Sequence, residues 1–155
     1  MKRWLMKSEP DVFSIDDLAR SPRKTTHWDG VRNYQARGFM RDQMRAGDLA
    51  FFYHSNCEEP AIAGIVRVLK QGYPDHTAFD ERDKHYDPDS DPAAPRWYMV
   101  DVHFERKLKH PITLATLREH SNGALRGLAL LRRGNRLSIT PMSDEHWRFI
   151  LSLER

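Results

Sequence analysis

The sequence has little or nothing of several features that mark particular classes of protein. It holds a single cysteine, Cys57, among 155 residues, so no internal disulfide can form, and redox chemistry is not expected. Its longest apolar runs, such as 128–131, are far shorter than the roughly 20 residues that cross a bilayer. The apolar stretch at the N-terminus is too short for a signal peptide. We therefore expect no membrane partner and a protein that stays inside the cell.

Motifs for the common catalytic and metal-binding sites are also missing. The glycines match neither the phosphate-binding loop of nucleotide hydrolases nor the dinucleotide pattern. His54 and Cys57 have no second pair of ligands at zinc-finger spacing, so we expect no metal and no cofactor. There is no G-x-S-x-G motif and no known catalytic signature around Cys57. The protein is therefore expected not to be an enzyme, and acid–base catalysis by Glu9 or His54 is kept as the third hypothesis.

Charge is unevenly distributed along the chain. Residues 73–95 contain seven acidic residues and four prolines, with only Arg82 and Lys84 as basic residues. This composition predicts a long loop, and since the spacing of a calcium loop is absent, we interpret it as solvated. Residues 105–136 instead hold eight basic residues against two acidic ones. Such a stretch fits either a surface that meets a polyanion or a solvated face.

Hydrophobic periodicity predicts a mixture of strands and short helices. The strands are expected at 3–7, 49–53, 61–69, 97–106 and 136–140. The helices are expected at 14–20, 33–45, 114–118 and 143–151. Ser14 and Ser143 have the character of N-cap residues, and the strands 49–53 and 61–69 are expected to pair antiparallel. The pattern favours an α+β fold around a strongly bent sheet or small barrel, in a single domain that spans 1–155.

Aromatic residues alternate with short polar ones in three segments, 4–10, 28–34 and 53–56. The rings of Trp28 and Tyr53 offer flat surfaces for stacking, and neighbouring hydroxyl, amide and carboxylate groups can read the edge of a planar heterocycle. Gly30 would allow a ligand to approach the backbone closely. The alternative interpretation is that these aromatic side chains belong to the core. The composition thus fits a base-binding pocket without requiring one.

These segments and several others resemble the EVE domain family and, within it, the thymocyte nuclear protein branch. The resemblance covers almost the whole chain through the segments 4–10, 28–37, 47–48, 51–56, 73–75, 85–88 and 136–141. It implies a PUA-like fold, a bent β-barrel of about five or six strands with flanking short helices, related to YTH and ASCH domains. It further implies a pocket for a modified nucleobase, with DNA carrying 5-methylcytosine or an oxidised derivative as the leading ligand.

The resemblance also assigns roles by position. Trp28 would pack against the base, while residues of the opening strand and of 53–55 would form the pocket edge and the polar readers. The candidate base-binding residues are Lys7, Ser8, Glu9, Trp28, Asn33, Tyr53, His54 and Ser55. Arg32 would hold a phosphate or order its loop. The candidate phosphate-binding residues, which include the arginines of the basic stretch, are Arg32, Arg132, Arg133 and Arg136.

The main hypothesis is a non-enzymatic module whose basic surface binds phosphates and whose pocket receives a base flipped from the stack. Modified DNA is the expected partner, and an RNA-binding module for modified RNA is the alternative. The basic N-terminal tail that the resemblance associates with nuclear animal members is absent. We therefore expect a stand-alone bacterial protein in the cytoplasm, associated there with the nucleoid; a eukaryotic version would be nuclear.

Overall fold

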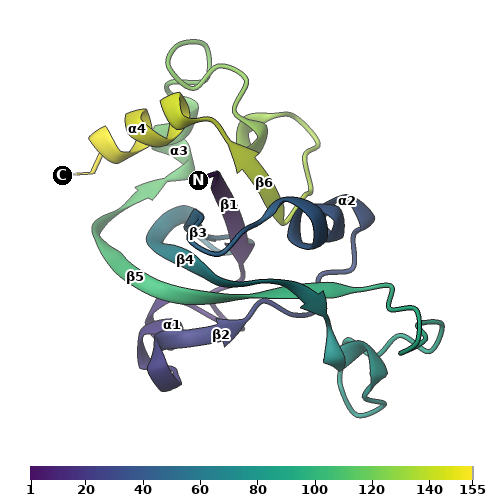
Figure 1. Cartoon of the computed structure of the whole chain (residues 1–155). Coiled ribbons are helices and arrows are strands. Elements are labelled where there is room, and N and C mark those ends of the chain that lie inside the picture. The colour runs from purple at the N-terminus through teal and green to yellow at the C-terminus, as the bar shows by residue number, and fades with distance from the viewer. Residues whose placement is uncertain (155) are drawn as a thin grey trace.

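Six strands pair in one mixed sheet, which the computed structural model shows as a strongly bent layer with short helices around it (Figure 1). The structure describes residues 1–154. The strands are β1 (Arg3–Ser8), β2 (Thr25–His27), β3 (Leu49–His54), β4 (Ala61–Pro74), β5 (Tyr98–Thr113) and β6 (Ile139–Met142). Their order in the sheet is β2-β5-β4-β3-β1-β6, with β1 and β3 parallel and the other neighbours antiparallel. The sheet therefore bends like a barrel wall but stays open between β2 and β6.

Three short helices lie in the connections between these strands, and a fourth follows the last strand. They are α1 (Ile15–Arg20), α2 (Tyr34–Gly38), α3 (Leu114–Arg118) and α4 (Asp144–Ser152). The predicted caps are confirmed: the Ser14 hydroxyl accepts from Asp17 N at 3.1 Å, the Asp17 carboxylate accepts from Ser14 N at 2.8 Å, and the Ser143 hydroxyl accepts from His146 N at 3.1 Å. Within residues 1–154, every helix is too short or too polar to cross a membrane.

The helix predicted over 33–45 is present over 34–43, but only its first half is an α-helix. The α-helix stops at Gly38 and continues as a single π-helical turn, η2 (Phe39–Gln43), in which Met44 N donates to the Phe39 carbonyl at 2.8 Å. Three short 3-10 turns were also not predicted: η1 (Pro22–Lys24), η3 (His76–Phe79) and η4 (Ala129–Leu131). Of these, η3 lies near the start of the acidic segment 73–95 and gives that part of the segment a regular backbone.

The two long strands β4 and β5 bend together across the molecule (Figure 1). Their pairing shifts register at four places, and such bulges increase the bend and twist of paired strands. Gly64 of β4 lies beneath α1, where an added Cβ would sit 2.7 Å from Ile15 Cδ1 and 2.8 Å from the Arg106 carbonyl oxygen. Because Gly64 has no side chain, α1 can approach the sheet closely. The segment between β1 and α1 therefore stays close to the end of β1.

The core has two parts, one on each side of the bent sheet. Phe52 packs with Trp4 and Trp28 in one cluster, while its neighbours in sequence, Phe51 and Tyr53, belong to the other. This division follows from the alternation of side chains along a strand. The first cluster lies beneath α1 and the segment around Trp28, and that is where the functional site is found.

Candidate functional site

An open pocket of about 780 Å³ lies where four segments meet. Its lining comes from 7–13 at the end of β1, 26–32 after β2, 82–85 in the acidic loop, and Ser138 before β6. Side chains that are far apart in the sequence therefore form one site. A volume of this size falls in the range of small-molecule sites, typically about 300–1,000 Å³.

Trp28 forms a fixed apolar wall of this pocket. Its backbone N donates to the Val100 carbonyl at 2.8 Å, and its ring meets Phe52 edge to face with the centroids 5.5 Å apart. Only 7% of Trp28 is exposed, so the exposed part of its ring is a small, rigid surface at the pocket. The alternative interpretation of Trp28 as a core residue is thus confirmed, and its contact with a base stays a prediction.

The sequence suggested that Gly30 would leave open space for a ligand, and the structure shows that it does not. It has a φ of +74°, and a Cβ at this position would overlap the imidazole ring of His85. The space that a side chain would fill at this position is occupied by the ring of His85, which packs directly on the Gly30 backbone. Glycine is required here both by the left-handed conformation and by this contact.

A buried carboxylate, Asp75, ties the segment after Trp28 to the acidic loop. Asp75 is fully buried and accepts hydrogen bonds from Gly30 N at 2.8 Å, Thr77 N at 2.9 Å and Arg32 Nη1 at 3.1 Å. Burial by itself would raise the pKa of Asp75, but the hydrogen bonds from Thr77, Gly30 and Arg32 outweigh it and the pKa lies below its usual value. The carboxylate is therefore ionised and holds both segments in place.

Arg32 takes the second of the two roles expected for it, which is to order the loop. Its guanidinium pairs with Asp75 and donates from Nη2 to the His85 carbonyl at 2.6 Å. It also lies over the Trp97 ring, with Cζ 5.3 Å from the centroid. With its donors used in this way, Arg32 supports the pocket wall. Phosphate binding by Arg32 stays a prediction that no contact here supports.

The acidic segment is ordered by its own carboxylates. Besides Asp75, four aspartates each accept a hydrogen bond from the backbone N two residues later, at distances between 2.8 and 3.0 Å: Asp80, Asp83, Asp87 and Asp91. Such side-chain turns replace regular structure. Asp87 also accepts from Trp97 Nε1 at 2.6 Å. The predicted long loop is confirmed, and its residues 82–85 form one wall of the pocket.

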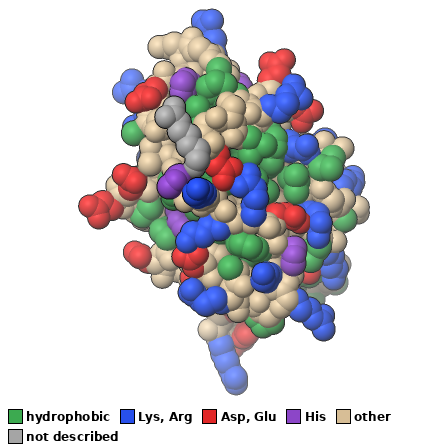
Figure 2. Space-filling view, turned by 90° about the vertical axis from the view of Figure 1, so that its left-hand side faces the viewer, with side chains coloured by type: hydrophobic (Ala, Val, Ile, Leu, Met, Phe, Trp, Pro, Cys, Tyr) green, Lys and Arg blue, Asp and Glu red, His purple; other side chains and the backbone are tan. Residues whose placement is uncertain are grey.

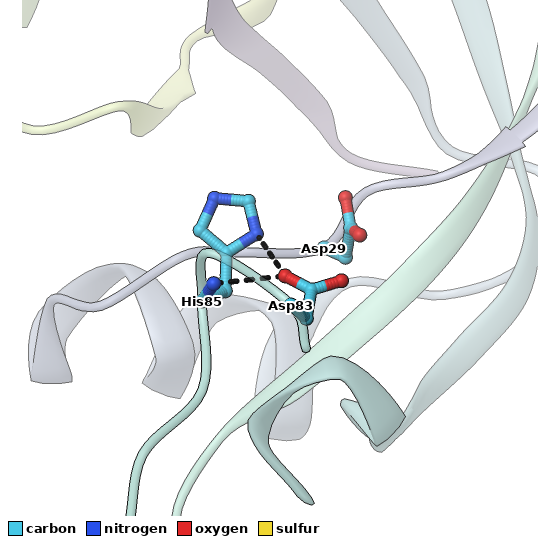
Figure 3. Close-up of side chains that lie close together, drawn as sticks. All are labelled: Asp29, Asp83 and His85. Atoms are coloured by element: carbon cyan, nitrogen blue, oxygen red, sulfur yellow. Dashed lines mark hydrogen bonds and ion pairs between the residues drawn. The ribbon is translucent and has the colours of Figure 1, made fainter. Parts of the chain in front are cut away.

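Two residues of this wall lie beside Asp29 of the opposite segment, and their side chains point toward one another (Figure 3). The carboxylate oxygens of Asp29 and Asp83 and an imidazole nitrogen of His85 all lie within 4.8 Å of one another. His85 Nδ1 is 3.3 Å from Asp83 Oδ1. Oxygen and nitrogen ligands in this arrangement suit a divalent cation. The same carboxylates also suit an amino group on the edge of a base.

The three candidate residues at the end of β1 do line the pocket. Lys7 is half-buried, and burial lowers the pKa of its amine. The Ser8 hydroxyl donates to the Phe13 carbonyl at 2.5 Å, which leaves its oxygen lone pairs as acceptors. Glu9 is exposed and accepts from Asn56 Nδ2 at 2.9 Å. The site thus has both a cation and hydrogen-bond acceptors opposite the wall 82–85.

The other four candidate base-binding residues are not in the lining that the structure describes, and their side chains or backbone serve the fold. Asn33 caps α2, accepting from Ala36 N at 3.0 Å. Tyr53 lies in the second core cluster, where burial raises its pKa to about 12. His54 Nε2 accepts from Ile15 N at 3.1 Å, and Ser55 N donates to the Ser8 carbonyl at 2.9 Å. Tyr53 was misplaced because the alternation of β3 directs it away from Trp28.

The predicted phosphate-binding arginines of the basic stretch also lie outside the described pocket lining: Arg132, Arg133 and Arg136. Part of the stretch is neutralised, since Arg106 forms two hydrogen bonds to Glu154 at 2.7 and 2.8 Å and Lys107 pairs with Asp16 at 2.9 Å. Figure 2, which views the side toward the bend of β5, shows Lys and Arg side chains interspersed with Asp and Glu. No single continuous basic patch is seen on that face.

Among the pocket residues that sequence reasoning missed are the three of this cluster, Asp29, Asp83 and His85, and the two basic residues Arg82 and Lys84. Asp29 and His85 did lie inside segments that carried the family resemblance, and that was the one available signal. Their proximity depends on the Arg32 and Asp75 contacts, which join segments 45 residues apart. Local patterns do not encode such a contact.

Comparison with known proteins places this fold and pocket in a family. The model of the EVE domain matches residues 2–153. Thymocyte nuclear protein 1 of Danio rerio is 50% identical, over 98% of this chain and 71% of its own length. The crystal structure of human THYN1 in complex with DNA containing 5-methylcytosine is 49% identical and superposes with a TM-score of 0.95, over 100% of this chain and 98% of that one.

A bacterial structure is nearly as similar. A protein from Pseudomonas syringae is 45% identical and superposes with a TM-score of 0.92, over 99% of each chain. The expected bent sheet with flanking short helices is confirmed by these superpositions. With a family model that matches residues 2–153 and relatives of about half identity, the chain belongs to the EVE domain family.

Proposed function

We propose that the protein is a non-enzymatic module that binds nucleic acid and receives a modified base, of the 5-methylcytosine type in DNA, in the pocket beside Trp28. The observation that carries the proposal is the match over the whole chain to human THYN1, whose structure is a complex with DNA containing 5-methylcytosine. At 49% identity and a TM-score of 0.95, the segments that form the pocket here have equivalents there.

The chemistry of the pocket agrees with a cytosine-type base. The edge of cytosine carries an amino group, and the carboxylates of Glu9, Asp29 and Asp83 can accept hydrogen bonds from it. Thymine and uracil present a carbonyl oxygen at that position, which a carboxylate repels. A methyl group on the base adds only about 1 kcal/mol of apolar contact against the pocket wall. We therefore expect modest selectivity between the modified and the unmodified base.

A base that enters the pocket from a duplex must first leave the stack. This step costs a few kcal/mol, which contacts to the ring face and edge must offset. Trp28 supplies a rigid aromatic surface, and Phe13 adds a second, partly buried ring at the pocket. Because both are held by the core, little side-chain freedom is lost on binding.

The substitution Trp28→Phe tests the pocket with little damage to the core. We expect it to bring the ratio of affinities for oligonucleotides with and without 5-methylcytosine, about fivefold for a methyl contact of about 1 kcal/mol, down toward one, because the smaller ring loses part of the apolar wall that the methyl group contacts. The matched control is Trp147→Phe, at the ring that stacks on Phe51 in the other core cluster. Binding is measured by fluorescence anisotropy of labelled oligonucleotides, and folding by thermal melting.

An unchanged ratio in the Trp28→Phe variant, with normal folding, would contradict the pocket assignment. The non-enzymatic part is tested separately by the mass of the modified oligonucleotide after incubation with the protein. We expect no change in mass; a changed mass would mean that Glu9 or another pocket residue acts on the base.

A further inference from the structure

The acidic loop brings its two basic residues to the pocket. Residues 73–95 contain seven acidic residues, and Arg82 and Lys84 are the only basic ones. Both line the pocket, on the wall opposite the end of β1. A segment of net negative charge thus presents its positive charges at the site, whereas the basic stretch 105–136 does not contribute to the lining.

The direction of these side chains follows from the alternation of exposure along the loop tip. Arg82, Lys84 and Tyr86 are exposed, while Asp83 and His85 between them are half-buried. The inner side chains face Asp29 and Gly30 in the pocket wall. The outer ones are therefore free to meet a molecule that lies across the pocket mouth.

The loop tip is held firmly enough to fix the position of both cations. Asp80 accepts from Arg82 N at 2.9 Å, and Asp83 accepts from His85 N at 2.8 Å. The His85 carbonyl in turn accepts from Arg32 Nη2 at 2.6 Å, and Arg32 is paired with the buried Asp75. The backbone on one side of Lys84 is thus tied to the core through His85, and on the other side Asp80 of the same loop holds the backbone of Arg82.

Neither cation has a carboxylate partner. Nine ion pairs are formed within the described part of the chain, and Arg82 and Lys84 take part in none of them. Arg32, Arg106 and Lys107 are all paired. Of the carboxylates nearest in sequence, Asp80 and Asp83 accept backbone hydrogen bonds instead, and Glu81 takes part in none of the nine ion pairs. Two unpaired cations beside an acceptor-rich pocket are suited to an anionic group attached to the pocket ligand.

We propose that Arg82 and Lys84 bind the phosphates that flank the base in the pocket, in the role that the sequence assigned to the arginines of the basic stretch. This inference rests on the proposed function, because it requires the pocket ligand to be part of a nucleic acid chain. The base would be read inside the pocket, while the loop tip would position the phosphodiester backbone without reading sequence.

The double substitution Arg82→Gln with Lys84→Gln tests this role, and Arg132→Gln with Arg133→Gln is the matched control. The control removes the same charge from two exposed neighbours outside the pocket. Affinities for a DNA duplex with and without 5-methylcytosine are measured across a salt series. Each lost phosphate contact lowers the slope of log affinity against log salt by about 0.9, so we expect a decrease of about 1.8 in the loop variant only.

At 50 mM salt the loop variant should lose affinity by a factor on the order of 10 to 100, equally for both duplexes, so that the preference for the modified base is kept. An unchanged slope in this variant overturns the inference, as does an equal decrease in both double variants, which would indicate a diffuse surface charge. If Trp28→Phe loses the preference for 5-methylcytosine but keeps the wild-type slope of log affinity against log salt, base reading and phosphate binding are separate, as the inference requires. Absence of any salt-dependent binding by the wild-type protein would overturn the proposed function and this inference together.

Discussion

The buried carboxylate of Asp75 has a larger influence on the site than any residue that lines it. It joins the backbone of Gly30 to the start of the acidic loop and pairs with Arg32, which holds the loop tip through the His85 carbonyl. A buried charge of this kind is tolerated only when its partners are complete. The family resemblance drew attention to 73–75 as a segment, but no local pattern distinguishes this aspartate from the six other acidic residues of 73–95.

Replacing Asp75 with asparagine should destabilise the fold strongly. The amide keeps the size of the side chain but removes the charge, which leaves Arg32 without its anionic partner at a partly buried position. Breaking such a pair costs about 3 kcal/mol. The free energy of unfolding in urea measures the loss. Asp89→Asn, an exposed acidic residue of the same loop, is the control and should change stability by less than about 0.5 kcal/mol. Equal effects of both substitutions would show that Asp75 does not organise the loop.

Among the elements, those specified by local sequence were predicted best. The first and last helices were placed within about a residue, because Ser14 and Ser143 make the hydrogen bonds that N-cap residues make in any context. The change from α-helix to π-helix within the segment 33–45 was not predicted. There Gly72 of β4 packs against the Met40 carbonyl so closely that a Cβ would overlap it. That contact is non-local, and the periodicity of 33–45 does not contain it.

The strands show the same division. Strands β1 and β3 were predicted within one residue at each end, and the antiparallel pairing of β3 with β4 is confirmed. Strand β2 was missed, because its three residues pair with β5 alone and have no apolar alternation of their own. Strands β4 and β5 extend beyond their predicted ends, because each supplies hydrogen bonds that the other needs. Pairing, rather than composition, sets their length.

The contact between His54 and α1 should make stability depend on pH. His54 Nε2 accepts the hydrogen bond of Ile15 N at the start of α1, which requires a neutral ring. Burial lowers the pKa of His54 from its usual 6.5. A lowered pKa in the folded state means that this stabilisation is complete above pH 6.5 and is lost as the pH falls through the folded value. Part of the stability should therefore disappear as the pH falls below about 6.5.

The substitution His54→Gln isolates this effect, since a glutamine oxygen can accept the same hydrogen bond without titrating. We expect the variant to lose less of its melting temperature than the wild-type protein when the pH is lowered from 7.5 to 5.5. The exposed His110 provides the control substitution, His110→Gln. If the wild-type protein and the His54→Gln variant respond identically to pH, the ring of His54 does not cap α1.

For the whole molecule, the sequence predicted the fold and part of the pocket lining, while the roles of these residues toward a base stay predictions. Lys7, Ser8, Glu9 and Trp28 were found because they stand in two conspicuous segments that the sheet brings together. The opposite wall was missed because residues 82–85 reach the pocket only through the fold of a loop without regular structure. A count of charges in the basic stretch 105–136 does not show that Arg106 and Lys107 are paired with Glu154 and Asp16, and phosphate binding by the arginines of this stretch stays a prediction.

The separation between base reading and phosphate binding predicts how the whole protein responds to salt. Its formal net charge is only +3, so attraction to nucleic acid must come from a few cations rather than from the overall field. Contacts of Arg82 and Lys84 to phosphates are exposed and weaken as salt rises, whereas contacts inside the pocket are screened far less. Between 50 and 300 mM salt we expect total affinity for DNA to fall steeply while the ratio for duplexes with and without 5-methylcytosine stays constant within about twofold.

Tryptophan fluorescence and anisotropy on matched DNA and RNA oligonucleotides measure both quantities in one titration. The two polymers share the phosphate charge but differ in the 2′-hydroxyl and in helix shape, so a preference for DNA that persists at high salt would place polymer discrimination at the pocket mouth. A modified-to-unmodified ratio that falls toward one as salt rises would contradict a shielded pocket. In that case the modification would be sensed at the exposed surface, through the cations of the loop tip, and not beside Trp28.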